Sequence, residues 1–344
     1  MMTSTQGKPR ILVLNATCLD VVEEHRAWIE EQGAALVAEQ EFRGITQRQM
    51  AELLRDTDAA ILPAPHAITP AMMAASPRLK VLSIAASGYD WLDMEAATSC
   101  GIVVTNAPVR EGAEVVADMA WALMLTVARR IPFHHQAIRE RRPQEMNLNI
   151  LPRGIGASVW GKTLGIIGLG QIGKAVARRA CGFEMRVLAA TPRANETFAK
   201  CHNIEIVSLD ELLQQSDFVS LHARLNPQTE NMIGARELSL MKPSAFLINT
   251  ARRQLADEAA LTQAIMQNRI AGAALDDPPQ DASTPLLDLP NVVFSTHLGN
   301  RAREGMHAVF RCALQNAVSI LRGEETPFIL NPEVRSRSKT GKQL

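Results

Sequence analysis

A glycine-rich turn between an apolar strand and a helix constrains this chain more than any other feature. The turn is "GLGQIG", with Gly168, Gly170 and Gly173. The first glycine permits a tight turn, the second lets a pyrophosphate approach the backbone, and the third allows the helix to pack closely on the strand. "TLGIIG" reads as a strand that ends in the first of these glycines, and "KAVARRACGF" after the turn has a helical pattern. This context predicts a dinucleotide site, with phosphate at the helix N-terminus, where free amides and the helix dipole favour an anion.

The strand that follows this helix ends without the acid that such a unit usually carries. An acid about twenty residues after the glycines bonds the ribose 2′-hydroxyl and favours NAD, whereas an arginine there can meet the 2′-phosphate of NADP. In "VLAATPR" that position holds Thr191, with Arg193 two residues later. Threonine does not repel a phosphate and arginine can pair with one. We therefore expect NADP(H) to be favoured over NAD(H); the alternative is a solvated Arg193 and a protein that accepts either cofactor.

Short apolar runs alternate with helical patterns along most of the chain. A first series contains "RILVLNA", "AAILPA", "KVLSIAAS" and "GIVVTNAP", and a second runs from the glycine turn to "VVFSTHL". Strands separated by helices of this length predict parallel βαβ units. A chain of 344 residues suits two domains. The expected fold class is α/β, with two doubly wound parallel-sheet domains of the flavodoxin or Rossmann type.

Charge and composition exclude several classes of protein. The 36 basic and 36 acidic residues give no net charge, which argues against a nucleic-acid binder. The five cysteines are scattered without a CxxC, so we expect free thiols in a reducing cytoplasm and no metal site. The N-terminus lacks the apolar stretch of a signal peptide, and the most apolar window, 115–128, is short for a bilayer and contains Asp118. We expect no membrane association.

Three later segments place charged side chains just beyond apolar strands. Arg252 follows "FLINTA", acids follow "AGAAL", and His297 follows "VVFST". Ligands of an open α/β sheet bind outside the carboxyl ends of its strands, so these side chains can converge on one cleft. Arginine can grip a substrate carboxylate with two hydrogen bonds, and a histidine held by an acid can give a proton to a carbonyl oxygen.

Over roughly residues 50–332 the chain resembles the D-isomer-specific 2-hydroxyacid dehydrogenase family. The motifs that carry the resemblance include "GKTLGIIGLGQIG", "SDFVSLHARLNPQTENMIG", "LMKPSAFLINTARR", "PLLDLPNVVFSTH" and "ASGYDWLDMEAATSCGIVVTNAP". The resemblance implies a dinucleotide domain, 109–301, inserted into a substrate domain formed by 1–108 and 302–344. It also implies a homodimer built around a helix at 113–131 and the arm after it.

The resemblance also implies roles for individual residues. Arg252 matches the arginine that binds the substrate carboxylate, and His297 matches the general acid/base. The backbone at Ser87 and Gly88 matches the loop that holds the same carboxylate. Positions matching the cofactor contacts are the pyrophosphate pair Gln171 and Ile172 and, along the rest of the cofactor, Ala223, Thr250, Ala251, Asp276 and Gly299.

The chain departs from the family at the acid that supports the histidine. In the family this is a glutamate, five residues after the aspartate that corresponds to Asp276; here that position is Asp281. Aspartate carries the same charge on a shorter stem, and we expect Asp281 to pair with His297. Asp277 is the alternative partner, and the absence of any direct acid partner is a third reading.

Two smaller departures concern the substrate. Pro63 stands where phosphoglycerate-type members often carry an arginine for the phosphate, which argues against 3-phosphoglycerate. Arg253 replaces the glycine that usually follows the arginine of the "NTAR" motif. Arg253 is expected either at the surface or at the cleft mouth, where it would add positive charge for an anionic substrate.

Together these features predict an enzyme that reduces a small 2-oxoacid, such as glyoxylate or hydroxypyruvate, to the D-2-hydroxyacid, or catalyses the reverse oxidation. The altered acid keeps a second hypothesis open, a non-enzymatic NAD(P) sensor or corepressor on the same fold. A third hypothesis is a dehydrogenase of this fold that acts on another hydride donor, such as formate or phosphite.

Overall fold

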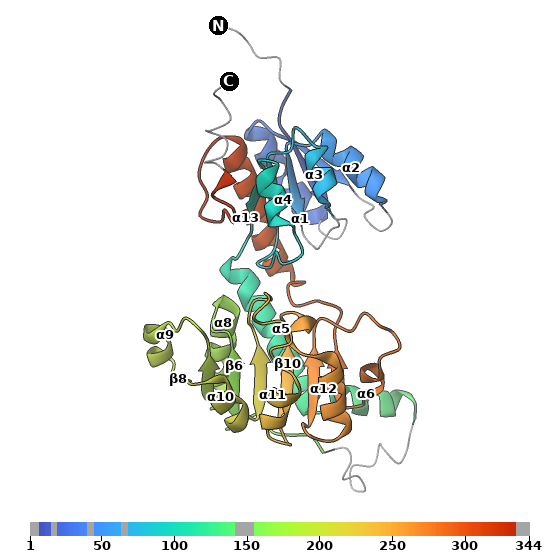
Figure 1. The fold of residues 1–344 in the computed structure, drawn as a ribbon, viewed down its shortest axis with the longest axis vertical. Helices are drawn as coiled ribbons and strands as arrows, with labels where there is room; N and C mark the ends of the chain where they lie inside the picture. Colours follow the sequence, from blue (N-terminus) through green and yellow to red (C-terminus); the bar gives the residue numbers. More distant parts are fainter. Residues whose placement is uncertain (1–6, 15–18, 40–44, 63–67, 142–154, 335–344) are drawn as a thin grey trace. The chain divides into compact units, whose positions relative to one another are not determined.

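The computed structural model describes residues 7–14, 19–39, 45–62, 68–141 and 155–334. The chain divides into two compact units, one made of residues 1–112 and 303–344 and the other of residues 113–302 (Figure 1). The boundaries expected from the sequence, after residues 108 and 301, fall four residues and one residue earlier. Pro63 lies outside the described residues, as does much of the arm expected after residue 131.

The first unit is a five-stranded parallel sheet in the order β2-β1-β3-β4-β5. This is the flavodoxin-like order. Its strands are β1 (Arg10–Leu14), β2 (Ala35–Glu39), β3 (Ala59–Leu62), β4 (Val81–Ile84) and β5 (Val103–Thr105). Its helices are α1 (Leu19–Glu31), α2 (Gln47–Arg55), α3 (Pro70–Ala74), α4 (Met94–Ser99) and α13 (Arg303–Leu321).

Alternation along the first strand explains why helices cover both faces of this sheet. Ile11 and Val13 pack in one buried cluster with residues of α1 and α13. Leu12 and Leu14 pack in another with residues of α2, α3 and α4. Successive side chains of a strand point to opposite faces, so a continuous apolar run needs cover on both sides.

The second unit is a seven-stranded parallel sheet in the order β12-β11-β10-β9-β6-β7-β8, which is the Rossmann order with one further strand. Its strands are β6 (Thr163–Ile167), β7 (Arg186–Ala190), β8 (Ile204–Ile206), β9 (Phe218–Leu221), β10 (Phe246–Asn249), β11 (Gly272–Leu275) and β12 (Val292–Phe294). Its helices are α5 (Arg110–Ala128), α6 (Ile131–Arg139), α8 (Gln171–Ala180), α9 (Glu196–Cys201), α10 (Leu209–Gln215), α11 (Ala235–Leu240) and α12 (Glu258–Met266). Short 3-10 turns span Cys181–Phe183, Arg253–Leu255 and Pro285–Asp288.

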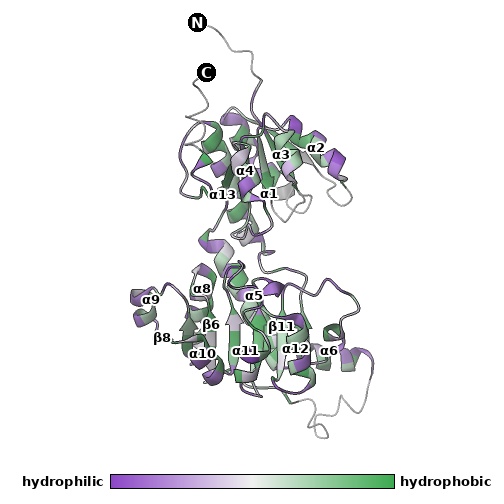
Figure 2. Ribbon diagram, in the orientation of Figure 1, coloured by the Kyte–Doolittle hydropathy of each residue, from purple (hydrophilic) through white to green (hydrophobic). Residues whose placement is uncertain are grey.

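Two apolar clusters cover the faces of the seven-stranded sheet. Residues of α5 and α8 pack on one face, and residues of α10, α11 and α12 on the other. Figure 2 shows the hydrophobic colouring gathered on the strands and the hydrophilic colouring on outer helical surfaces. Trp121 of α5 stacks on Phe183, with ring centroids 4.6 Å apart, and its indole N–H donates to the Val176 carbonyl of α8 at 3.2 Å. The indole therefore belongs to the core of this unit.

The first part of the arm expected after residue 131 is helical: it forms α6, Ile131–Arg139. No helix in the described part of the chain is both long and apolar enough to cross a bilayer. Among the described residues no group of three or more His, Cys, Asp or Glu side chains is arranged to hold a metal ion.

The register of the seven-stranded sheet brings the loops that carry the candidate site residues together at the carboxyl ends of the strands. The last residues of the central strands lie level: Ile167 pairs with Leu221, Leu221 with Asn249, Asn249 with Leu275, and Leu275 with Phe294. Because all these strands are parallel and adjacent strands lie about 4.8 Å apart, the loops after them start side by side. This edge carries the glycine turn, the "NTARR" loop, the acidic loop and the histidine loop.

Candidate active site

The glycine turn follows β6 directly, and its three glycines meet three different surroundings. Gly168 has φ +95°, and a Cβ there would lie 2.8 Å from the His222 carbonyl and from the Ala223 amide. A Cβ on Gly173 would overlap the Gly168 carbonyl oxygen. A Cβ on Gly170 would meet nothing within 4 Å. The first and third glycines therefore allow close packing, and the second leaves the space in front of α8 open.

The open space fits the pyrophosphate of a dinucleotide. The helix α8 begins at Gln171, and the first N–H groups of a helix have no partner within it. Gln171 and Ile172 stand at that position, so their amides can donate to phosphate oxygens. Further along the same edge, the Thr250 hydroxyl is buried and has no hydrogen-bond partner in the described part of the chain. A buried hydroxyl normally has a partner, and a bound ligand would supply one.

A half-buried histidine borders the glycine turn. His222 directly follows β9, and its Nε2 lies 2.8 Å from the Ser220 hydroxyl. Burial lowers the pKa of His222 to about 4. The ring is therefore neutral at physiological pH and adds no positive charge beside the phosphate site. Its neighbour Ala223, expected along the cofactor, is half-buried at the same edge.

The two residues expected to decide between NADP and NAD, Thr191 and Arg193, follow the end of β7. Thr191 is half-buried and Arg193 is exposed. The Gly168 amide donates to the Ala190 carbonyl at 2.9 Å, so this strand end lies against the glycine turn. Arg193 makes no ion pair with a described carboxylate, which leaves its guanidinium accessible to an anion.

The loop after β10 is held by the side chain of Asn249. Its amide group donates to the Arg252 carbonyl at 2.7 Å, and its oxygen accepts from the Ala251 amide at 3.0 Å. Arg252 is half-buried, and its Nη1 donates to the Ala251 carbonyl at 2.9 Å. The sequence interpretation missed Asn249; an asparagine that ends an apolar strand just before the arginine is the signal that could have identified it.

The loop that carries His297 is fixed by a buried carboxylate. Asp276, 3% exposed, directly follows β11. Its Oδ1 accepts from the Ser295 hydroxyl at 2.5 Å and from the Leu298 amide at 2.8 Å, and its Oδ2 accepts from the Gly299 amide at 2.8 Å. Both oxygens are therefore engaged within the protein, whatever contact Asp276 makes along a cofactor.

The histidine itself has an uncommon backbone conformation. His297 has φ +57°, in the left-handed region that costs an L residue roughly 1–2 kcal/mol. Its amide donates to the Asp276 carbonyl at 2.5 Å. Its side chain is 50% exposed, so the ring can reach a ligand. Strain of this kind at a reactive side chain is typical of functional sites.

The carboxylate beside His297 is that of Asp277, and the expected pairing with Asp281 is not present. Asp277 Oδ1 lies 3.5 Å from His297 Nδ1, and its Oδ2 accepts from the Arg253 amide at 3.1 Å. Asp281 Oδ1 instead accepts from the amide and the hydroxyl of Ser283, at 2.8 and 2.7 Å. The physical reason is local: Asp281 is exposed and caps its own turn, whereas Asp277 lies immediately after the strand end.

The two acids differ in electrostatic surroundings. Burial raises the pKa of Asp277, but hydrogen bonds from the His297 ring and the Arg253 amide, with the charges of His297 and Arg252, lower it below its usual value overall. Hydrogen bonds from Ser283 lower the pKa of Asp281. Both carboxylates are therefore ionised at neutral pH, and only Asp277 is ionised beside the imidazole.

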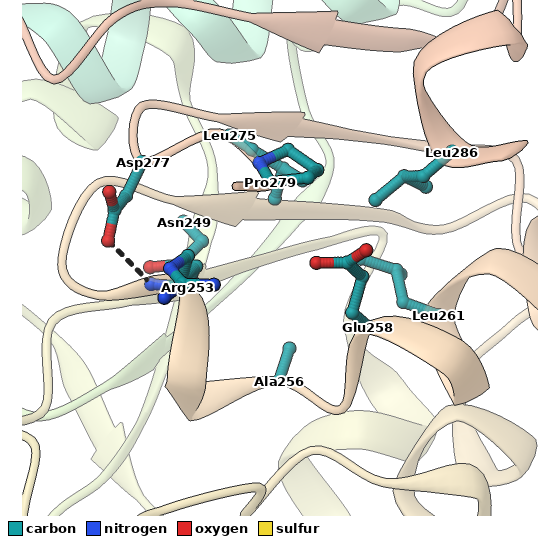
Figure 3. Close-up of a pocket in the computed structure, with 9 residues that line it drawn as sticks. All are labelled: Asn249, Arg253, Ala256, Glu258, Leu261, Leu275, Asp277, Pro279 and Leu286. Atoms are coloured by element: carbon teal, nitrogen blue, oxygen red, sulfur yellow. Dashed lines mark hydrogen bonds between the residues drawn. The ribbon is translucent and has the colours of Figure 1, made fainter. Parts of the chain in front are cut away.

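A small open pocket lies behind this carboxylate. Figure 3 shows Asp277, Arg253 and Glu258 around it, with the dashed line marking the bond from the Arg253 amide to Asp277. The remaining lining residues are Asn249, Ala256, Leu261, Leu275, Pro279 and Leu286. Arg253 is thus half-buried at this edge, and its backbone belongs to the site.

The loop that the resemblance expects to hold the substrate carboxylate belongs to the first unit. Ser87 is exposed and Gly88 half-buried, just after β4. The buried Asn106 donates from its side-chain amide to the Ser87 carbonyl at 2.9 Å. Asn316 of α13 donates in turn to the Asn106 carbonyl at 3.0 Å, so two buried amides fix this loop.

Comparison with known proteins agrees with this geometry. Residues 121–299 match the family model described as "D-isomer specific 2-hydroxyacid dehydrogenase, NAD binding domain". A glyoxylate reductase of Korarchaeum cryptofilum is 36% identical, across 95% of this chain and 97% of that protein. A glyoxylate reductase of Thermococcus gammatolerans is 37% identical, across 97% of this chain and 99% of that one.

Solved structures share the fold. A glyoxylate reductase from Paecilomyes thermophila is 28% identical, with a TM-score of 0.80 over 95% of this chain and 99% of that one. An acyclic imino acid reductase, Bsp5, solved with NADPH and D-Arg, is 31% identical, with a TM-score of 0.81 over 93% of this chain and 100% of that one. The glycine turn, the arginine and histidine at one sheet edge, and these relatives agree: the chain belongs to the D-isomer-specific 2-hydroxyacid dehydrogenases, a family of NAD(P)-dependent oxidoreductases.

Proposed function

We propose that this enzyme reduces glyoxylate, hydroxypyruvate or a similarly small 2-oxoacid to the D-2-hydroxyacid, and catalyses the reverse oxidation. The observation that carries the proposal is the level placement of Arg252 and His297 on the loops after β10 and β12, on either side of the Asp276–Asp277 loop. The names of the glyoxylate reductase relatives support the choice of substrate.

Each residue has a defined task in this reaction. Arg252 pairs with the substrate carboxylate and thereby orients the carbonyl. His297 gives a proton to the carbonyl oxygen as the carbonyl carbon is reduced, and takes it back in the oxidation. The nicotinamide supplies or accepts the hydride when bound, and we assign its side of the site to Thr250, Ala251, Asp276 and Gly299.

The first experiment follows the absorbance loss of NADPH and NADH with glyoxylate, hydroxypyruvate and several longer 2-oxoacids, and determines the configuration of the product. We expect turnover, a D product, and little turnover for the variant R252A, because the charge that holds the carboxylate is lost. Nucleotide binding without turnover of any substrate would favour the sensor hypothesis. Oxidation of formate or phosphite, identified by product analysis, would favour another hydride donor.

We further propose that NADP(H) is favoured over NAD(H). The absence of an acid at Thr191 and the accessible guanidinium of Arg193 support this preference. In R193A we expect KM for NADPH to rise about tenfold and KM for NADH to change by less than twofold, since a charge-assisted contact to phosphate contributes about 1.5 kcal/mol or more. An equal rise for both cofactors would refute the selector role.

We also propose a cytoplasmic homodimer. Large apolar side chains of α6 and of the segment before β6 are exposed: Ile131 by 52%, Ile138 by 60%, Ile155 by 76% and Trp160 by 63%. The resemblance places the dimer interface at the helix at 113–131 and the arm after it, and an interface there would remove these apolar side chains from water. Sedimentation should give a dimer for the wild type and a monomer for I138E/W160E; a wild-type monomer would refute the proposal. The described cysteines are all free thiols, as suits a reducing compartment.

A further inference from the structure

We propose that Asp277 positions His297 for proton transfer in this enzyme, and that the same carboxylate fixes the loop that carries Arg252. This inference rests on the proposed function, because it assigns a support to the proton donor of that reaction. It places the supporting charge four residues earlier than the motif of the family predicts.

The backbone of the histidine loop is already fixed without Asp277. Asp276 accepts three hydrogen bonds from residues 295–299, and its carbonyl accepts the His297 amide. What remains free is the rotation of the His297 side chain. A group that acts on the ring must therefore supply orientation and charge.

Asp277 meets both requirements. Its side chain is 23% exposed, and its Oδ1 lies 3.5 Å from Nδ1 of the imidazole. A carboxylate on Nδ1 fixes the tautomer and leaves Nε2 as the atom that exchanges a proton with substrate. Asp281 is engaged elsewhere, because its Oδ1 accepts from the amide and the hydroxyl of Ser283 in its own turn.

The second oxygen of Asp277 connects the proton donor, His297, to the loop of Arg252, the residue proposed to bind the substrate carboxylate. Oδ2 accepts from the Arg253 amide, which directly follows Arg252 in the chain. One carboxylate therefore contacts both loops that must act on the same substrate. Shortening or removing it should affect substrate binding as well as proton transfer.

In the part of the chain that the structure describes, Asp277 is the carboxylate that pairs with the His297 ring. Arg252 contributes favourable charge to Asp277, and Arg253 and Glu258 line the adjoining pocket. The Asp276 oxygens are directed to the amides and hydroxyl of residues 295–299. Nearby opposite charge favours the protonated form of an imidazole.

Two substitutions at Asp277 separate its two tasks. In D277N the amide oxygen can still accept from the Arg253 amide, but the charge beside the imidazole is lost. We expect kcat to fall about 10- to 100-fold, as for loss of a charged hydrogen-bond partner, and KM for the 2-oxoacid to stay within about threefold. In D277A the contact with the Arg253 amide is lost too, and KM should rise at least about tenfold.

The pH profile supplies a readout that a merely structural role would not change. We expect the pH profile of reduction by D277N to differ from that of the wild type, because the charge 3.5 Å from the proton donor is lost. D281N should keep the wild-type profile and a kcat within twofold. D288N, an exposed aspartate in the same segment, controls for the loss of one negative charge.

A measurement without turnover keeps this inference separate from the proposed function. Nitrogen NMR spectra of protein labelled with 15N-histidine, with H297Q to identify the signal, should show that D277N shifts the Nδ1 resonance of the His297 ring and D281N does not, because Asp277 lies 3.5 Å from that nitrogen. If the wild type reduces no 2-oxoacid, the proposed function fails while these spectra still test the pairing. A shift in D281N without one in D277N would overturn the inference, and thermal unfolding of each variant excludes loss of fold.

Discussion

Replacing Asp276 by asparagine tests whether hydrogen bonds to one buried carboxylate hold the catalytic loop. The side chain keeps its shape, but one of its two oxygens becomes an NH2 group. In the wild type Oδ1 accepts from Ser295 and Leu298, and Oδ2 accepts from the Gly299 amide. If the asparagine oxygen takes the first position, its NH2 faces the Gly299 N–H, and that buried donor loses its acceptor.

The size of the effect follows from these contacts. An unsatisfied buried donor costs about 1–3 kcal/mol. The left-handed conformation of His297 costs roughly 1–2 kcal/mol, so the lost bond is comparable with the strain that it helps to offset. At about 1.4 kcal/mol per factor of ten, the active loop conformation and kcat/KM for the 2-oxoacid should fall by about 5- to 150-fold.

The assay compares kcat/KM with the free energy of unfolding in urea and with the dissociation constant for NADPH. We expect D276N to lose about 1–3 kcal/mol of stability and to bind NADPH within about threefold of wild type. S295A should lower kcat/KM by no more than about fivefold, because the Leu298 amide still donates to the same oxygen. Wild-type kcat/KM in D276N would refute the reasoning, and a loss confined to NADPH affinity would assign Asp276 to the nicotinamide instead.

Three further predictions follow from other contacts. G173A should lower stability by about 1–3 kcal/mol and weaken NADPH binding, because its Cβ would overlap a carbonyl of the glycine turn; urea unfolding and titration calorimetry measure both, and unchanged values would contradict the packing argument. Burial lowers the pKa of His222 to about 4 from 6.5, so between these pH values the unfolded state binds a proton that the folded state does not, and stability falls as pH falls. From pH 7.5 to 5 the wild type should lose about 2 kcal/mol more unfolding free energy than H222Q in urea unfolding. Equal losses would show that the ring is solvated. N106A removes the donor to the Ser87 carbonyl and should raise KM for the 2-oxoacid about fivefold without changing NADPH affinity; unchanged KM would separate this loop from substrate binding.

The glycine turn and the two parallel sheets could be predicted from the sequence alone. The glycine turn could be predicted because its requirements are local: an apolar strand, residues without Cβ where backbone or ligand approaches, and a helix start. Gly168 at φ +95° and the open space at Gly170 are the geometries that such a motif demands. The two parallel sheets followed from the alternation of apolar runs and helical patterns, since parallel strands need crossover connections.

Contacts between segments distant in sequence could not be read in the same way. Counting from Asp276 along the family motif selects Asp281, but the loop of this chain contains two prolines and Asp281 caps its own turn with Ser283. Some local contacts were missed as well: the sequence shows Asn249 at a strand end just before the arginine, but an asparagine there has many possible partners. Only the backbone geometry of the loop shows that its amide and oxygen contact Arg252 and Ala251.

The sequence by itself determined the fold class, the nucleotide motif and the identity of the arginine and histidine at the sheet edge. Each depends on short-range pattern: periodicity, turn chemistry and the rule that ligands bind at the carboxyl ends of parallel strands. Tertiary structure decided which acid meets His297. That choice depends on the level ends of β10, β11 and β12, which bring Asp277 between the Arg253 amide and the imidazole. Distances of 3.1 and 3.5 Å between three separate loops are set by packing of the whole sheet, and sequence spacing alone does not specify them.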